Sequence, residues 1–334
     1  MPPTMILCAD VGGTKTKLAL FRPDDLLEAV WLQTYASAEV DDLGTLVEAL
    51  VARERWTIDA ASLGVAGPVI GTRVETTNLP WRIDAQALGA SLGGVPVFLL
   101  NDLEALAYGI PALPARALVT LNPGQSVDKG AIAVIAAGTG LGQAGLVWDG
   151  RRWLALASEG GHADFAPRSD REVALLRYLL RRWDHVSWER LVSGPGLVHI
   201  LEFLRDVEDE PVPAPLADAI ATGDPAAAIT AAALAGGVSI ATMALDLFVR
   251  LYGAEAGNLA LKLKAMGGVY VGGGIAPKIL PKLVDGAFRD AFLAKGRFRD
   301  LLEAIPLRVI LDDDTALYGA ARYAAEQRTI PTST

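Results

Sequence analysis

Cysteine and histidine are scarce in this sequence. One cysteine, Cys8, and three histidines occur among 334 residues, which excludes an intrachain disulfide and a cysteine-rich zinc site. Positive charge is also in short supply, because 30 lysines and arginines face 39 aspartates and glutamates, for a formal net charge of −9. Nucleic acids and anionic membranes attract basic surfaces, so we expect neither as a partner. A nucleotide remains compatible if backbone N–H groups and a divalent cation neutralise it.

The sequence also lacks the features of an exported or membrane-spanning chain. The apolar run near the N-terminus has no basic residues before it, so we expect no signal peptide. Residues 226–245 carry no charge over twenty positions, which is long enough to cross a bilayer. Their flanks, Asp224 and Asp246, are acidic rather than basic, and small residues dominate the stretch. We therefore predict a buried helix in a cytoplasmic protein.

Composition and length predict a folded chain with two α/β domains. Apolar residues make up 51% of the chain and charged residues 21%, which excludes disorder. A length of 334 residues is too great for one small core and fits two domains. Strand-like and helix-like stretches alternate. Each half opens with a strand, a glycine-rich turn and a second strand, at residues 5–21 and 131–148.

The proline- and glycine-rich segment 110–130 is the natural boundary between the halves. The predicted domains are a small α/β lobe at 1–112, completed by a C-terminal helix at 315–330, and a large α/β lobe at 113–314. Within the large lobe, residues 226–264 are predicted to form two helices, broken near Tyr252 and Gly253.

Two glycine-rich loops stand between strands, one in each half. In the first, Asp10 is followed by Gly12, Gly13 and Thr14, and residues 138–142 repeat the device. Glycine lets a backbone approach an anion closely, and a threonine hydroxyl adds a donor. A plain hairpin turn would explain one such loop, but two loops favour phosphate binding. The Asp10 carboxylate, at a strand end, could hold Mg²⁺ through water.

Two common nucleotide motifs fit poorly. Gly140, Gly142 and Gly145 spell the G-x-G-x-x-G fingerprint of dinucleotide-binding proteins, which requires a following helix. Residues 146–150 indicate a strand and a turn instead, which argues against a dehydrogenase. A Walker P-loop requires a Gly-Lys dipeptide, and the sequence contains none.

Three groups of polar residues have the composition of a site, and each also has a plain structural interpretation. Asn101 and Asp102 follow an apolar strand, where either could cap the next helix. Glu159 and His162 flank two glycines, which would also suit an exposed turn. Glu189 would by default be a solvated helix residue. The sequence contains neither a nucleophile elbow nor a zinc-ligand spacing.

Taken in order, these motifs resemble those of the bacterial glucokinase family, within the hexokinase–actin–sugar kinase superfamily. The resemblance covers nearly the whole chain, and its most specific part is the block Glu-Gly-Gly-His-Ala-Asp-Phe. The motifs that carry it are Asp10–Thr14, Leu100–Asp102, Gly138–Gly142, Glu159–Phe165, Ser193–Gly196 and Gly272–Ile275.

The resemblance implies a two-lobed actin-like (ribonuclease H-like) ATPase fold with an inter-lobe cleft, and ATP-dependent phosphorylation of glucose to glucose 6-phosphate, feeding glycolysis. Asp102 would be the catalytic base for the 6-hydroxyl, and Asp10 would hold Mg²⁺ through water. The implied glucose ligands are Asn101, Asp102, Glu159, His162 and Glu189. The implied ATP ligands are Asp10, Gly12, Gly13, Thr14, Gly138, Thr139, Gly140, Gly272, Gly273 and Gly274.

Two departures from related patterns bear on the substrate and the subgroup. The family commonly continues Gly-Gly-Thr with Asn-Ala-Arg, whereas this chain has residues 15–17 as Lys-Thr-Lys, so another phosphoryl donor such as polyphosphate stays open. With Cys8 alone, the zinc motif of the related repressor–open reading frame–kinase group is impossible. Phosphorylation of another hexose, a non-catalytic sugar-sensing function and an actin-like structural ATPase also stay open, as does a homodimer.

Overall fold

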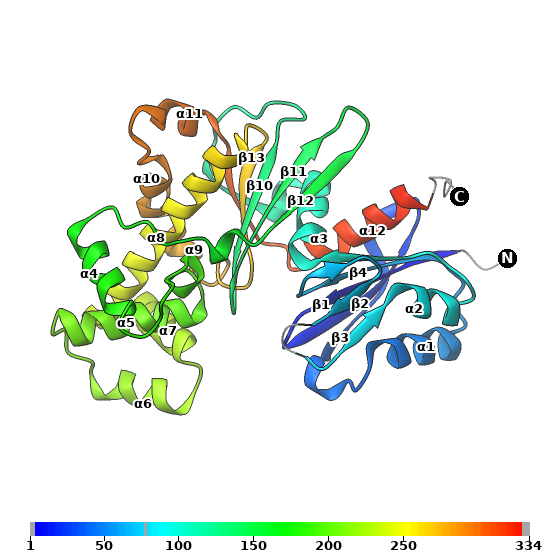
Figure 1. Ribbon diagram of the computed structural model, residues 1–334, viewed down its shortest axis with the longest axis horizontal. Helices are drawn as coiled ribbons and strands as arrows, with labels where there is room; N and C mark the ends of the chain where they lie inside the picture. Colours follow the sequence, from blue (N-terminus) through cyan, green and yellow to red (C-terminus); the bar gives the residue numbers. More distant parts are fainter. Residues whose placement is uncertain (1–3, 77–78, 329–334) are drawn as a thin grey trace. The chain divides into compact units, whose positions relative to one another are not determined.

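The computed structural model describes residues 4–76 and 79–328 and divides into two compact units. The first unit comprises Met1–Ala115, Asp149–Ala157 and Asp312–Thr334, and the second comprises Arg116–Trp148 and Ser158–Leu311 (Figure 1). This division gives the segment 149–157 to the first unit, an assignment not expected from the sequence. Residues 1–3, 77–78 and 329–330 of the predicted lobes lie outside the described residues.

The first unit is built on a mixed sheet. Its strands, in spatial order, are β3 (Asp25–Ala36), β2 (Lys15–Arg22), β1 (Met5–Val11), β4 (Ile58–Val65) and β8 (Val97–Asn101). The pairs β1–β2 and β2–β3 are antiparallel, whereas β4 is parallel to both β1 and β8. A smaller sheet contains β5 (Val69–Ile70), β6 (Arg73–Glu75) and β7 (Arg82–Asp84).

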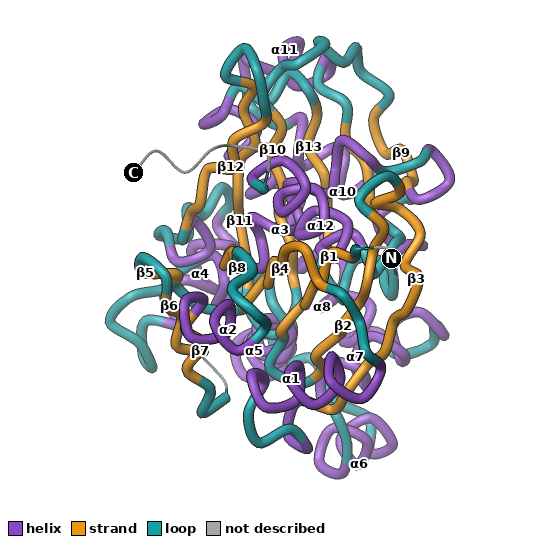
Figure 2. The backbone as a smooth tube through the Cα atoms, turned by 90° about the vertical axis from the view of Figure 1, so that its right-hand side faces the viewer, coloured by secondary structure: helices purple, strands orange, loops and turns teal. Residues whose placement is uncertain are grey.

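Helices cover both faces of the larger sheet, because successive strand residues point to opposite sides. Leu7 and Ala9 of β1 belong to one buried cluster, with residues of α1 (Leu43–Glu54) and α2 (Ala85–Ser91). Ile6 and Cys8 belong to another cluster, with α12 (Thr315–Gln327). Helix α3 (Asp102–Gly109) packs against α12 on that side (Figure 2). Strand burial on both faces explains the continuous apolar runs of this half.

The second unit has its own sheet, in which β11, β10, β13, β14 and β9 are neighbours in that order. Their bounds are Leu141–Trp148, Ile132–Ala137, Gly268–Gly272, Leu307–Ile310 and Leu118–Asn122. The helices of this unit are α4 (Asp170–Leu179), α5 (Gly194–Val207), α6 (Ala214–Thr222), α7 (Pro225–Ala235), α8 (Ser239–Leu263), α9 (Leu280–Leu283), α10 (Ala287–Leu293) and α11 (Arg299–Ala304). Strand β12 (Trp153–Ser158) lies at the unit boundary, and only its last residue belongs to the second unit. The predicted α/β class is confirmed.

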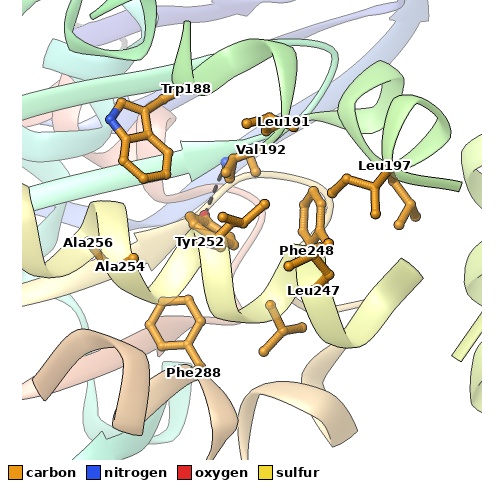
Figure 3. Close-up of a cluster of buried hydrophobic side chains, with 14 of the residues drawn as sticks. Trp188, Leu191, Val192, Leu197, Leu247, Phe248, Tyr252, Ala254, Ala256 and Phe288 are labelled. Carbon is orange, nitrogen blue, oxygen red and sulfur yellow. Dashed lines mark hydrogen bonds between the residues drawn. The ribbon is translucent and has the colours of Figure 1, made fainter. Parts of the chain in front are cut away.

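Helix α8 is the centre of the large core, and it corrects one sequence prediction. The predicted break near Tyr252 and Gly253 is wrong, because α8 is one continuous helix from Ser239 to Leu263. Figure 3 shows Tyr252 within this helix. A Cβ on Gly253 would lie 2.2 Å from the carbonyl oxygen of Phe288, so this glycine permits close helix packing. The real break lies at Gly236 and Gly237, whose φ angles of 76° and 83° suit glycine.

The break also bears on the uncharged stretch noted in the sequence. Among the described residues, no single helix is long and apolar enough to cross a membrane. Helices α7 and α8 pass that test only as a pair, and the pair is bent by 104°.

Candidate active site

Asp10 and Asp102 lie at the end of the first unit's sheet where the parallel strands β1, β4 and β8 finish. Asp10 is paired in register with Gly64 of β4, and Gly64 is paired with the residue before Asn101 in β8. The parallel strands β1, β4 and β8 therefore end together. A Cβ on Gly64 would lie 2.8 Å from Cβ of Ala105 and 3.9 Å from Cα of Asp102. Glycine at position 64 thus lets α3 begin close to β4.

The charge around Asp10 is strongly negative. Burial, followed by the carboxylate of Asp102, raises the pKa of Asp10 to about 6. Asp313 and Asp314 act in the same direction, whereas Lys17 lowers this pKa. The Lys17 ammonium donates to Asp314 Oδ1 at 2.6 Å and to the Asp313 carbonyl at 3.0 Å. The Asp10 carboxylate and those of Asp102, Asp313 and Asp314 outnumber the single Lys17 ammonium, so a bound cation would be stabilised here.

Asn101 and Asp102 have different structural roles. Asn101 is the N-cap of α3: its Oδ1 accepts from Leu103 N–H at 3.0 Å, and Glu104 Oε2 accepts from Asn101 N–H at 2.9 Å. The Asn101 amide also donates to the Gly67 carbonyl at 3.2 Å. Asp102 is the first residue of the helix, and its Oδ1 accepts from Leu103 N–H at 2.9 Å. The capping interpretation therefore holds for Asn101, and Asp102 is not the cap.

The loop of Gly12, Gly13 and Thr14 is held by a residue that the sequence analysis missed. The hydroxyl of Ser37 donates to the Gly12 carbonyl at 2.8 Å, and Ser37 N–H donates to the Thr14 carbonyl at 3.0 Å. Gly13 and Thr14 remain exposed. Ser37 is buried, and its Oγ also lies 2.9 Å from the hydroxyl of Thr16. The buried Ser37 thus fixes the carbonyls of Gly12 and Thr14. No local sequence pattern identifies Ser37 as part of the site.

The second glycine-rich loop joins β10 to β11 and is hydrogen-bonded at two points to the distant segment 189–194. Gly138 N–H donates to the Gly140 carbonyl at 2.8 Å, and the Gly138 carbonyl accepts from Gly194 N–H at 2.8 Å. Leu141 N–H donates to Glu189 Oε2 at 2.9 Å. A Cβ on Gly140 would lie 2.5 Å from the same carboxylate oxygen. The exposed Thr139 stands at the tip of this loop.

Glu189 and His162 come together from separate segments. His162 Nδ1 lies 3.9 Å from Glu189 Oε1, and the two side chains are 59% and 30% exposed. An isolated bridge between Asp164 and Ser187, and a bond from Trp188 N–H to a carbonyl in the other segment, align the segments. Glu189 is not a plain solvated side chain, because it also accepts from Leu141 N–H at the end of the 138–140 loop.

The two glycines between Glu159 and His162 let this turn lie directly on β11. A Cβ on Gly161 would lie 1.9 Å from the carbonyl oxygen of Leu141, and one on Gly160 would lie 2.3 Å from Gln143 Oε1. A side chain at position 161 would displace the turn from the β11 backbone, and one at position 160 would displace the turn or the Gln143 side chain. Glu159 is exposed, and its carbonyl accepts from His162 N–H at 3.0 Å.

The Gly272–Gly274 loop ends β13 beside the end of β10. Gly273 has a φ of 82°, and a Cβ on it would lie 2.5 Å from the Ala137 carbonyl oxygen. Beneath this point lies the buried hydroxyl of Tyr252, which accepts from Ala137 N–H at 3.1 Å and donates to the Ile135 carbonyl at 3.2 Å. Burial raises the pKa of this phenol. Tyr252 was expected at a helix break, and no local sequence pattern indicates this contact.

The predicted site residues form one group in each unit. Asp10, Asn101 and Asp102 share an edge of the first sheet, near the 12–14 loop. The second group contains Gly138, Thr139, Gly140, Glu159, His162, Glu189, Gly272, Gly273 and Gly274. Within residues 4–76 and 79–328, no group of three or more His, Cys, Asp or Glu side chains is arranged to hold a metal ion.

Comparisons with known proteins indicate the same family as the sequence motifs. A family model described as Glucokinase matches residues 7–327. Glucokinase of Nostoc punctiforme is 41% identical over 96% of this chain and 99% of its own length. The crystal structure of a glucokinase from an Antarctic psychrotroph has a TM-score of 0.84 at 31% identity, covering 96% of this chain and 99% of that one.

A third similarity concerns the fold alone. A ROK family glucokinase from Streptomyces griseus, in complex with glucose and AMPPNP, has a TM-score of 0.64 at 23% identity, covering 96% of this chain and 99% of that one. The predicted two-lobed actin-like fold is confirmed by these structural matches.

Proposed function

The chain belongs to the glucokinase family, and on that premise we infer that it transfers the γ-phosphoryl group of ATP to the 6-hydroxyl of glucose. The product would be glucose 6-phosphate, the entry point of glycolysis. The observation that carries this proposal is the position of Asp102. Its carboxylate lies at the sheet edge beside Asp10, while Asn101 and Glu104 supply the helix cap.

We assign the base function to Asp102. Phosphoryl transfer to an alcohol requires the hydroxyl to be aligned with the phosphorus and its proton to be removed as the bond forms. A carboxylate at the start of a rigid helix can orient the hydroxyl and accept the proton. The neighbouring amide of Asn101 is held by Gly67 and would add a hydroxyl contact from a fixed position.

The remaining glucose ligands in this proposal are Glu159, His162 and Glu189. A sugar presents many hydroxyls, so its site needs several acceptors and donors rather than apolar surface. His162 and Glu189 support this role because both are partly exposed while their positions are set by the bridge between their segments. Glucose bound by a Streptomyces griseus relative of the same fold supports the same sugar.

ATP would be held by glycine-rich backbone rather than by basic side chains. Gly12, Gly13 and Thr14 would face phosphates in the first unit, and Gly138, Thr139 and Gly140 would do so in the second. Gly272, Gly273 and Gly274 would lie against the adenosine. The exposure of Gly13, Thr14 and Thr139 at the loop tips supports this assignment, as does the AMPPNP bound by the Streptomyces griseus relative.

A Mg²⁺ ion is compatible with the negative charge around Asp10 in the first unit. Asp10 has a raised pKa beside Asp102, Asp313 and Asp314, and Lys17 is the one cation among the groups that shift it. The described residues offer no ready-made set of protein ligands, so phosphate oxygens and water would supply most of the coordination, with Asp10 acting through water. The ion would neutralise charge on the transferred phosphate.

Location and partners follow from the same proposal. Because ATP is available inside the cell, we place the reaction in the cytoplasm, with small molecules rather than nucleic acid or membrane as partners. Strand β3 is a sheet edge with Leu27, Val30 and Leu32 exposed, which supports a homodimer through edge pairing. Light scattering on the purified protein would measure its mass.

A coupled assay tests the activity. We expect sugar-dependent ADP release with ATP and glucose, and less with mannose, glucosamine or fructose. Sugar-independent ATP hydrolysis would indicate an actin-like structural ATPase, and glucose binding without turnover would indicate a sugar-sensing regulator. Repeating the panel with polyphosphate tests the phosphoryl donor.

A further inference from the structure

A buried polar pair lies directly beneath the proposed sugar-binding turn. Gln143 of β11 and Glu255 of α8 are 1% and 0% exposed, and Gln143 Nε2 donates to Glu255 Oε1 at 2.9 Å. A buried carboxylate is costly unless it is paired and hydrogen-bonded. Asn258 also donates to Glu255 Oε2 at 2.8 Å, and the Lys262 ammonium lies 3.8 Å from Oε1.

The other end of the Gln143 amide faces the turn itself. A Cβ on Gly160 would lie 2.3 Å from Gln143 Oε1 and 3.0 Å from the Ser158 hydroxyl oxygen. Ser158 Oγ accepts from Gly160 N–H at 2.9 Å. The backbone between Glu159 and His162 therefore lies against the Gln143 side chain, and a Cβ at position 160 would displace either that side chain or the turn.

The carboxylate determines which way the amide points. The oxygens of a carboxylate accept hydrogen bonds, and the NH₂ group of Gln143 faces Glu255 while the amide oxygen faces Gly160. The far side of the pair is anchored as well, because Asn258 accepts from the Lys295 ammonium, which also donates to the Ala254 carbonyl at 2.8 Å. These hydrogen bonds and contacts thus connect the turn, through α8, to the segment that follows α10.

We propose that Gln143 and Glu255 are positioning residues that hold the Glu159–His162 turn in the position on β11 that sugar binding requires. The inference rests on the proposed function, because Glu159 and His162 are the glucose ligands there. Gln143 and Glu255 act through the turn and touch no substrate themselves. Their effect falls on glucose affinity, while the nucleotide loops are held by other contacts.

The test compares glucose and AMPPNP affinity by calorimetry in the wild type and in variants. Gln143→Leu removes the donor to Glu255 and the oxygen beneath Gly160. We expect the glucose Kd to rise about tenfold, the equivalent of roughly one lost buried hydrogen bond, and the AMPPNP Kd to change less than about twofold on the same scale. The glucose KM should rise by a similar factor, with kcat nearly unchanged.

A matched control separates positioning from stability. Ile240 lies on α8, is fully buried and is not part of the Gln143 pair, so Ile240→Ala lowers the melting temperature through a core cavity. If Ile240→Ala raises the glucose Kd as much as Gln143→Leu does, the pair is only structural and the inference is wrong.

An exchange of the two partners provides a rescue test. Gln143→Glu alone places two buried carboxylates together, and we expect it to bind glucose more weakly than Gln143→Leu. Adding Glu255→Gln restores one amide and one carboxylate with reversed polarity, and should recover most of the affinity. If Gln143→Leu does not fold, Gln143→Met keeps the chain length without the amide. Failure of the exchange to rescue glucose binding in a folded double variant would contradict the inference.

The wild-type measurement distinguishes the two proposals. If the wild type does not bind glucose, the proposed function and the inference both fail. If the wild type binds glucose and Gln143→Met or Gln143→Leu binds it equally well, only the inference fails.

Discussion

Replacing Asp102 with asparagine separates its proposed chemical role from its structural one. Asn keeps an oxygen that can accept from Leu103 N–H, the bond that Asp102 Oδ1 makes at 2.9 Å. It cannot accept the proton of the sugar hydroxyl. General base catalysis contributes about 10²–10⁴-fold, so kcat should fall at least ~10²-fold, which is about 2.7 kcal/mol in activation free energy.

The stability cost should be small because the cap stays in place. Asn101 and Glu104 form the capping box of α3, so the cap is kept in the variant, and removing the negative charge from the helix start costs about 0.3–1 kcal/mol. The glucose Kd should stay within about tenfold of wild type, or about 1.4 kcal/mol, since the side chain keeps its size and one acceptor.

The substitution also has a readout that does not depend on turnover. Burial is the main cause that raises the pKa of Asp10 to about 6, and the Asp102 carboxylate is the strongest charge that adds to it, so in Asp102→Asn this pKa should fall. Carboxyl-carbon NMR titration measures it. Glu104→Gln keeps an acceptor for Asn101 N–H and serves as a neighbouring charge-removal control with normal kcat. A fully active Asp102→Asn enzyme would remove Asp102 from the mechanism.

Three further predictions concern the second unit. His162→Gln should weaken glucose binding by about 1–2 kcal/mol, the scale of one buried hydrogen bond, and leave AMPPNP binding unchanged by calorimetry; an unchanged glucose Kd would contradict its assignment as a ligand. Gly161→Ala places a Cβ 1.9 Å from the Leu141 carbonyl, so it should abolish measurable glucose binding, whereas Gly138→Ala, with nothing within 4 Å of its Cβ, should not affect the fold by circular dichroism. Burial lowers the pKa of Lys295 to about 8 from 10.5, so between these values the unfolded state binds more protons and the free energy of unfolding should rise with pH. Urea titrations of wild type and Lys295→Met from pH 7 to 10 should differ in this slope, and equal slopes would contradict the lowered pKa.

Much of the fold could be predicted from local patterns. The β1–β2 and β10–β11 pairs each join two apolar strands through glycines, and Asp42 and Ser169 begin helices as their residue types predict. The break between α7 and α8 was misplaced because a single glycine has two opposite uses. Gly253 allows helices to pack closely, whereas consecutive glycines with positive φ end a helix.

The contacts that shape the candidate site could not be predicted in the same way. Glu189 and Leu141 are 48 residues apart, Gln143 and Glu255 are 112 apart, and Lys17 and Asp314 are 297 apart. Local periodicity carries no information about such pairs. A motif predicts which residues gather, but the residues that support them, such as Gln143, are ordinary strand or helix positions in the sequence.

The contacts of Glu189 have a consequence for how sugar preference can change. One oxygen of its carboxylate holds Leu141 N–H at the end of the 138–140 loop, and the other faces His162. A substitution at Glu189 made to suit a different hexose would therefore also release the loop proposed to hold phosphate. Within the described part of the chain, no hydrogen bond ties the side chain of Glu159 or His162 to the 138–140 loop, so new sugar specificities should evolve, or be engineered, through them while Glu189 stays unchanged.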